Sequence, residues 1–238
     1  EVNNVAFRLL GSDGSVSNHD QSKSQADQLT AYQSSVIGDG GAMRVRKVSK
    51  SVIISNCFVE YCMRGMRIQD CESALVKNNT VYRCLESGIY LASVSYSGAS
   101  GCNNCVISNN RVSECYNNGI LVIGGSGNTV QGNNIVRSAN AAIMQWHSLD
   151  CRIIGNSIFD CNRLVHNGVG AVNGDAYGAI VVDGNSNIST TSGSYMSVVQ
   201  NNTMTACNQG GASSVIAIAV QRSASAAGVY PNLSNKII

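Results

Sequence analysis

Two aspartates stand on either side of a short apolar stretch in the second half of the chain. Asp175 precedes "GAIVV" at 178–182, and Asp183 follows it directly. Hydrolysis of a glycosidic bond needs two carboxyl groups across the bond, about 5–5.5 Å apart for retention or about 6.5–9.5 Å for inversion. We therefore predict Asp175 and Asp183 as a catalytic pair. The alternative is that both only shape turns, because each stands beside a glycine.

Aromatic and basic side chains are candidates for contact with a sugar. An aromatic ring combines a large apolar face with a polar edge, which suits the face of a sugar ring. The predicted substrate-binding residues are Trp146, His147, Tyr90, Arg67 and Tyr177. The alternative for the aromatic residues is a structural contact with the wall of the fold or with another subunit.

A lyase or epimerase would use other residues. Such chemistry needs a base that removes the proton next to a uronate carboxylate and a cation that neutralises the acid. Arg44, Arg46 and Arg67 form a candidate cationic stripe, with His147 or His166 as the base. The alternative is a solvated row of arginines.

The sequence gives little support for a metal or a cofactor. "CNNC" at 102–105 is a lone CxxC motif without a second pair at zinc spacing. Clustered aspartates typical of a calcium loop and a glycine-rich phosphate loop are both missing from the sequence. We expect neither a metal nor a cofactor.

All these residues lie in a repeat of about 23 residues, a period that indicates a solenoid. Each repeat has an Asn pair or its equivalent, an apolar anchor and a later cysteine, as in "NNTVYRC" at 78–84. The anchors are Val59, Val81, Val112, Val136, Ile158 and Met204. Two residues before them stand Cys57, Asn79, Asn110, Asn134, Asn156 and Asn202. Three residues after them stand Cys62, Cys84, Cys115, Ala139, Cys161 and Cys207.

These ladders favour stacked coils of parallel β-strands. Stacking brings like positions about 4.8 Å apart, so that Asn amides can hydrogen-bond from coil to coil. Asn also tolerates the left-handed conformation of a tight corner, and Cys is a small core residue. Several Leu in each repeat would indicate a leucine-rich repeat, and a 3.6-residue period a helical one; neither occurs.

We predict an all-β chain forming a single-stranded right-handed parallel β-helix of about seven or eight coils. Residues 1–42 are expected to form an irregular N-terminal segment or first coil, and residues 43–238 the β-helix. Insertions are predicted at 92–103, 162–177 and 187–195. We expect the ladder cysteines to be reduced core residues, because stacked neighbours have poor disulfide geometry.

A second apolar segment recurs in each repeat, as in "GMRI" at 65–68 and "GILV" at 119–122. Alternation along a strand places Met43, Met66, Ile89, Ile120 and Ile143 inward and Arg44, Arg67, Tyr90, Leu121 and Met144 outward. The predicted insertions lie next to this strand. Because loops that leave a solenoid often collect on its binding face, we expect the functional site on the outer face of this strand.

Over residues of about 51–161 and 198–220, the repeats resemble the pectate-lyase-like right-handed parallel β-helix superfamily. That superfamily includes polysaccharide lyases, epimerases, glycoside hydrolases and bacteriophage tailspikes. The resemblance to a tailspike or tail fibre implies a homotrimer fragment that binds and depolymerises a bacterial surface polysaccharide, capsule or O-antigen, by endo-acting glycoside hydrolysis. A non-enzymatic structural or adhesive module and a bacterial polysaccharide lyase or epimerase remain alternatives, although no short motif of an alginate epimerase or pectate lyase is found.

Charge and composition bear on partners and location. The net charge of +2 gives no reason to expect nucleic acid or an anionic membrane as a partner. The chain has no run of 18 apolar residues, so we expect no membrane insertion. Its ends resemble those of a fragment, and its free thiols favour folding in a reducing cytoplasm. The expected location is a virion tail folded in the host cytoplasm, with a secreted bacterial protein as the alternative.

Overall fold

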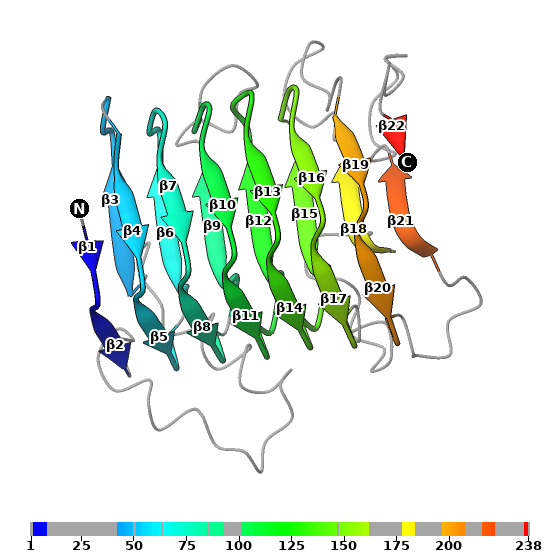
Figure 1. Cartoon of the computed structure of the whole chain (residues 1–238), viewed down its shortest axis with the longest axis horizontal. Coiled ribbons are helices and arrows are strands. Elements are labelled where there is room, and N and C mark those ends of the chain that lie inside the picture. Colours follow the sequence, from blue (N-terminus) through cyan, green and yellow to red (C-terminus); the bar gives the residue numbers. More distant parts are fainter. Residues whose placement is uncertain are drawn as a thin grey trace, which may run out of the picture.

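Three parallel β-sheets stack short strands from successive coils of the chain in the computed structural model (Figure 1). The structure describes residues 2–8, 42–49, 51–62, 64–84, 86–92, 101–146, 148–161, 178–183, 197–207, 216–221 and 236–237. Each described coil up to β21 contributes one strand to each sheet, β22 adds a last strand to sheet A, and neighbouring strands pair in parallel and in register. The predicted parallel solenoid is confirmed.

Sheet A contains eight strands: β1 (Val2–Asn3), β4 (Ile53–Ser55), β7 (Leu75–Lys77), β10 (Val106–Ser108), β13 (Thr129–Gln131), β16 (Arg152–Ile154), β19 (Val198–Gln200) and β22 (Lys236–Ile237). Sheet B contains seven: β2 (Ala6–Arg8), β5 (Phe58–Glu60), β8 (Thr80–Tyr82), β11 (Arg111–Ser113), β14 (Asn134–Val136), β17 (Ser157–Phe159) and β20 (Thr203–Thr205). Sheet C contains seven: β3 (Met43–Arg46), β6 (Met66–Gln69), β9 (Ile89–Ala92), β12 (Ile120–Ile123), β15 (Ile143–Trp146), β18 (Gly178–Asp183) and β21 (Ile216–Gln221).

The corner between sheets A and B has two residues in every described coil, such as Asn56 and Cys57 between β4 and β5. The first corner residue has a φ between 53° and 62° in each coil; these residues are Asn4, Asn56, Asn78, Asn109, Gly132, Gly155 and Asn201. Only glycine and, less readily, asparagine adopt this left-handed conformation at low cost. The corner composition therefore follows directly from the backbone geometry.

The second corner residue forms a ladder of buried amides. Asn133 illustrates it: its Nδ2 donates to Asn156 Oδ1 and to the carbonyl of Ile107, both at 3.0 Å. Its Oδ1 accepts from the backbone N–H and the Nδ2 of Asn110. All four hydrogen-bonding positions of the amide are thus filled, which removes the usual cost of a buried polar group. The members are the buried Asn79, Asn110, Asn133 and Asn156 and the half-buried Asn202.

One coil corrects the sequence alignment by one residue. The alignment took Val136 as the anchor, with Asn134 in the amide ladder and Ala139 at the thiol position. Instead, β14 places Ile135 opposite Ile158, and Asn134 is exposed on sheet B. The ladder positions in this coil belong to Gly132, Asn133 and Ser138. The alignment failed here because "GNNIV" offers two asparagines and two apolar residues, and serine replaces the cysteine from which to count.

Inward-facing side chains fill the lumen between the three sheets. They include the fully buried Ile54, Met66, Ile89, Ile107, Ile120, Ile135, Ile143, Ile153 and Ile158. All ten cysteines are free thiols and nine of them are buried, as predicted for ladder cysteines. Cys105 and Cys151, the first of them from the "CNNC" stretch, occupy the same step before β10 and β16 and belong to this core.

Candidate functional site

Sheet C carries the predicted site on the side that faces away from the lumen. The register places Arg44, Arg67, Tyr90, Leu121, Met144 and Val181 in one outward row along the solenoid. A second outward row contains Arg46, Gln69, Ala92, Ile123 and Trp146, and the backbone of Asp183 pairs with Trp146 at the same step of the next strand. The predicted inward and outward rows of this strand are confirmed, and the face runs from arginines in the first coil to apolar residues in the middle coils.

The middle of this outer face is buried rather than open. Tyr90 is 4% exposed, and Leu121 and Met144 are each 6% exposed. They form a second apolar cluster with Ala92, Ile123, Ala141 and Val181, and Trp146 packs against its border. Sheet C is therefore buried on both faces in these coils. Phe159 on sheet B, by contrast, is 43% exposed.

Arg67 and Tyr90, two predicted substrate-binding residues, contact each other. The Arg67 guanidinium carbon lies 5.3 Å from the centre of the Tyr90 ring, and that of Arg64 lies 5.7 Å from it. Arg64 also forms an ion pair with Glu86. Because Arg67 is only 4% exposed, the cation–π contact is largely desolvated and holds the ring in place.

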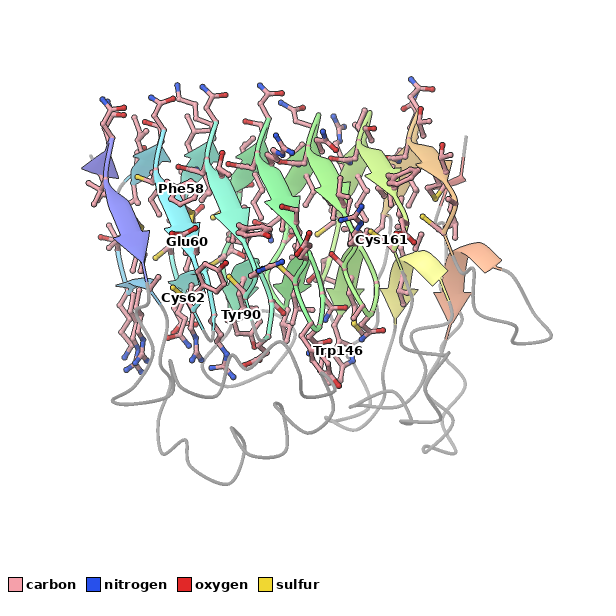
Figure 2. The ribbon with its side chains drawn as sticks, turned by 90° about the horizontal axis from the view of Figure 1, so that it is seen from below. Phe58, Glu60, Cys62, Tyr90, Trp146 and Cys161 are labelled. Carbon is pink, nitrogen blue, oxygen red and sulfur yellow. The ribbon has the colours of Figure 1, made fainter. Side chains whose placement is uncertain are left out.

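Trp146 and Asp183 are brought together although 37 positions separate them in the sequence. Trp146 ends β15 and Asp183 ends β18, and the two residues are Cα partners in the pairing of these strands. Trp146 keeps part of its surface exposed. In Figure 2, Tyr90 and Trp146 lie on the same side of the solenoid, away from Phe58 of sheet B. The candidate site is therefore an aromatic residue beside an acidic position at the edge of the buried cluster.

The other predicted site residues cannot be placed next to this pair. Asp175, His147, His166 and Tyr177 lie outside the described residues. Of Asp183 itself, the structure describes the backbone at the end of β18. The pairing of Asp175 with Asp183 thus stays a prediction.

The three arginines of the predicted stripe differ in their exposure to solvent. Arg44 and Arg46 are exposed in the first strand of sheet C, whereas Arg67 in the next strand is buried. Arg44 Nε donates to Gln69 Oε1 at 2.9 Å. Only Arg44 and Arg46 therefore face solvent as the stripe for a lyase or epimerase would require.

Ser87 and Asn118 carry two buried oxygen atoms, and they stand two residues before β9 and β12. Ala141 stands at the same step before β15 and packs in the outer apolar cluster. Both are buried, and within the described part of the chain Ser87 Oγ and Asn118 Oδ1 have no hydrogen-bond partner. Buried polar atoms without a partner are costly to the folded state.

Variation in coil length is confined to the two ends of the sheet C strands. Five residues separate Glu60 from Met66, whereas the segment 160–177 separates β17 from β18. Long segments also follow β9 and β18, at 93–105 and 184–197. The corner between sheets A and B keeps its length in all coils that the structure describes. Insertions thus enter or leave the solenoid only beside the face that carries Trp146 and Asp183.

A charged ladder along the corner after sheet B escaped the sequence analysis. Glu114 accepts from Arg83 Nε at 2.8 Å and from Arg137 at 3.2 Å, and Arg137 lies 3.6 Å from Asp160. The Arg83 guanidinium also lies over the Tyr82 ring. Part of the signal was present in the sequence: Arg83, Glu114 and Asp160 stand two steps after their anchors with alternating sign. Arg137 joins this pattern only after the anchor of its coil is corrected to Ile135.

These contacts explain the ionisation of the ladder. Burial by itself would raise the pKa of Glu114, but the hydrogen bond and charge of Arg83, with hydrogen bonds from Tyr82 and Arg137, lower the pKa overall. The Glu114 hydrogen bond is the main cause of the raised pKa of Arg83. Both groups are therefore charged at neutral pH and hold each other in place.

No cluster of three or more His, Cys, Asp or Glu side chains that would suit a metal ion occurs in the described ranges. The described part of the chain likewise contains no helix that is long and apolar enough to cross a membrane.

The fold and the family agree. The chain belongs to the right-handed β-helix family: the model described as "Right handed beta helix region" matches residues 3–158, more than half of the sequence. The solenoid is thus a right-handed β-helix, as its repeats predicted. A search of the curated proteins gives no match.

Two solved structures are similar to this chain at low sequence identity. One is DFA-IIIase from Arthrobacter chlorophenolicus A6 without its lid, with a TM-score of 0.48 and 14% identity over 83% of this chain and 45% of that one. The other is the A-module of a mannuronan C-5 epimerase from Azotobacter vinelandii, with a TM-score of 0.35 and 11% identity over 81% of this chain and 60% of that one. The chain spans less than two thirds of the length of either structure.

Proposed function

We propose that this chain is a polysaccharide-binding β-helix module of the kind found in bacteriophage tailspikes or tail fibres. It binds a bacterial surface polysaccharide, capsule or O-antigen, at the Trp146 end of the outer face of sheet C. It depolymerises that polysaccharide by glycoside hydrolysis. In this proposal the module is part of a homotrimer in a virion tail and takes no nucleic acid as a partner.

The observation that carries the proposal is the position of the insertions. The corner between sheets A and B keeps two residues in every described coil, while all length variation falls beside sheet C. Segments that depart from a regular scaffold tend to carry its binding function. Two such segments border β18, which ends at Asp183, and a third follows β9, two strands before the strand that holds Trp146.

The chemistry at this place fits a sugar ligand. Trp146 is supported from below by the apolar cluster and keeps part of its surface open to solvent. A tryptophan held in this way offers a sugar ring an apolar platform with little loss of side-chain entropy. Asp183 occupies the neighbouring step on the next strand. With Asp175 it would supply the two carboxyl groups that hydrolysis needs.

The test is incubation of the purified chain with a panel of capsular and O-antigen polysaccharides. Reducing ends and the absorbance of unsaturated uronates are measured together. We expect new reducing ends without that absorbance. Asp183→Asn should abolish this cleavage. Trp146→Ala should reduce the cleavage about ten-fold or more, as is typical when a tryptophan contact with a partner is removed. Phe159→Ala, which removes an exposed aromatic on sheet B, is the matched control and should leave cleavage unchanged.

Other products would replace this proposal. Unsaturated uronates would identify a lyase and turn attention to the exposed Arg44 and Arg46. Binding without cleavage would identify an adhesive module, and neither binding nor cleavage would identify a structural rod. The rod has a specific observation in its favour, because the unbroken amide ladder from Asn79 to Asn202 stiffens the solenoid along its length.

A further inference from the structure

One position in the lumen breaks the apolar pattern of sheet C. Strand pairing aligns Gln145 with one inward-facing residue of each neighbouring strand; these residues are Val45, Ile68, Leu91, Val122 and Val182. Gln145 is 1% exposed, so its amide is removed from bulk water. Burial of an amide is costly unless protein groups replace its hydrogen bonds to water. The partners of Gln145 therefore show what this residue does.

The Gln145 amide connects two successive turns of the chain. Its Nε2 donates to the carbonyl of Ser148 at 3.1 Å and to Ser197 Oγ at 2.6 Å. Ser148 belongs to the connection between β15 and β16, and Ser197 ends the connection between β18 and β19. Both serines are buried. The chain that leaves sheet C after Asp183 thus returns to the solenoid at a serine that contacts Gln145.

Ser148 extends this network to the preceding turn. Its hydroxyl donates to the carbonyl of Gly124 at 2.9 Å and lies 3.2 Å from the carbonyl of Trp146. Three consecutive connections, those after β12, β15 and β18, are therefore tied together by two side chains. The first two connections are short, at 124–128 and 147–151, whereas the third spans 184–197. The network joins the end of a long connection to two short ones.

Packing of the lumen does not require an amide at this step. Val122 and Val182, on the two adjacent strands, fill the same step with an apolar side chain. Gln145 Oε1 has no hydrogen-bond partner among the described residues, and a buried oxygen without a partner lowers stability. Residues that break a local rule of a fold in this way are expected where they serve a site.

The candidate site adjoins both partners of the amide. Trp146 follows Gln145 on β15 and faces outward, and Asp183 is its Cα partner on β18. One hydrogen bond of Gln145 reaches the turn that follows Trp146. The other reaches the far end of the connection that begins after Asp183. A single buried side chain thus fixes the chain on both sides of the site.

We propose that Gln145 is a positioning residue of the candidate site. Through Ser148 and Ser197 it holds the turn after Trp146 and the end of the connection 184–197 in one arrangement. Because its amide lies in the lumen and Trp146 faces outward, Gln145 acts through these segments and not by contact with the polysaccharide. The inference rests on the proposed function, since it assigns a role at the site of that function.

The test replaces the amide by an apolar side chain of similar length, in Gln145→Met. Leu91→Met is the matched control, because it places the same residue at the same lumen step two coils earlier. Gln145→Val, which copies the residue of both adjacent strands, provides a second variant should the first not fold. Circular dichroism and the melting temperature verify the fold of each variant.

Two readouts follow position without any substrate. The first is hydrogen exchange of the backbone amides of β19, where the N–H of Val198 donates to the carbonyl of Cys151 at 2.8 Å. We expect this exchange to become faster by up to about ten-fold in Gln145→Met, the effect of one lost buried hydrogen bond. The exchange in β10 should not change.

The second readout is the fluorescence of Trp146, which is the only tryptophan of the chain. Its emission should shift to longer wavelength in Gln145→Met, and acrylamide should quench it more strongly, because the turn that follows it is released. Leu91→Met should retain the wild-type emission and quenching. A role in stability alone would lower the melting temperature without moving either readout.

The third readout is cleavage of the polysaccharide. We expect kcat/KM to fall about ten-fold or more in Gln145→Met, because displacement of a site by a fraction of its dimensions has effects of this size. Ser197→Ala should produce a similar fall. The double variant should lose little more than either single variant, since both changes break the same contact.

The outcomes separate this inference from the proposed function. Wild-type exchange and emission in a folded Gln145→Met chain would overturn the positioning role, whether or not the wild type cleaves any polysaccharide. A wild type that cleaves nothing would overturn the proposed function, and exchange and emission would still decide whether Gln145 holds the two segments. Altered exchange with unchanged kcat/KM in Gln145→Met would overturn the link to the site.

Discussion

The corner between sheets A and B and the outer ends of the sheet C strands follow opposite rules. The first has two residues in each coil, one in the left-handed conformation and one in the buried amide ladder from Asn79 to Asn202. The second accepts segments of very different length. The difference teaches that one edge of the solenoid holds the register while another is free to vary.

The outer faces of sheets B and C differ in a related way. Sheet B exposes Phe159 and borders a ladder of alternating charges, as expected for a solvated wall. Sheet C buries Tyr90, Leu121 and Met144 although they point away from the lumen. The variable edge thus accompanies the face that carries a second apolar cluster, and four predictions test this division.

The largest effect is expected at the amide ladder. Asn133→Ala removes four hydrogen bonds inside the corner and takes from the buried backbone N–H of Asn110 its partner, and a buried group left unsatisfied costs about 1–3 kcal/mol by itself. We expect a loss of more than about 3 kcal/mol in the free energy of unfolding, measured by urea denaturation. The matched control is the adjacent, exposed Asn134→Ala, which should change it by less than about 0.5 kcal/mol. Equal losses in both variants would contradict the register.

A smaller loss is expected where the chain enters sheet C. A Cβ added to Gly119 would lie 2.6 Å from Ile135 Cγ2 and 2.7 Å from the carbonyl of Ala142. Overpacking of this kind costs about 1–3 kcal/mol, so Gly119→Ala should lower the free energy of unfolding by that amount. Ala142 stands at the same step of the next coil and already carries a Cβ. Ala142→Gly, the reverse change, should cost no more than about 1 kcal/mol.

The charged ladder beside sheet B should contribute little and depend on pH. The pKa of Glu114 is lowered in the folded state, so its stabilising contribution is present above the ordinary carboxyl range and is lost as pH falls below about 4.3. Glu114→Gln should cost less than about 1 kcal/mol at pH 7, because these ion pairs are partly exposed. Unfolding curves of both proteins at pH 7 and at lower pH should converge on acidification. A constant difference would show that the charge of Glu114 does not matter.

The smallest effect is expected at the left-handed corner position. Gly155 has a φ of 62°, and a Cβ there would meet nothing within 4 Å. Asparagine holds this position in five of the other described coils, so Gly155→Asn should change the free energy of unfolding by less than about 0.5 kcal/mol. Gly155→Val, whose branched side chain resists this conformation, should cost clearly more. Similar melting temperatures for the two variants would contradict the role of the corner.

Much of the fold was readable in the sequence because stacking repeats the same environment in each coil. The cysteine ladder and the corner asparagines report that repetition directly. The slip to Asn134 shows its limit: where serine replaces the ladder cysteine and two asparagines adjoin, local pattern cannot choose the register. A shift of one residue reverses every side chain of a strand, and only the pairing of Ile135 with its neighbours decides it.

The candidate site depended more on the tertiary structure. The sequence by itself determined that Tyr90, Leu121 and Met144 point outward from sheet C, since alternation along a strand is a local property. It did not determine that they are buried, because exposure depends on segments far away in the sequence. Nor did it show that Trp146 lies beside Asp183, or that Arg83, Glu114 and Arg137 form one ladder. Those residues come together only when whole coils stack. The physical reason is that paired strands lie at a fixed spacing, whatever the length of chain that connects them.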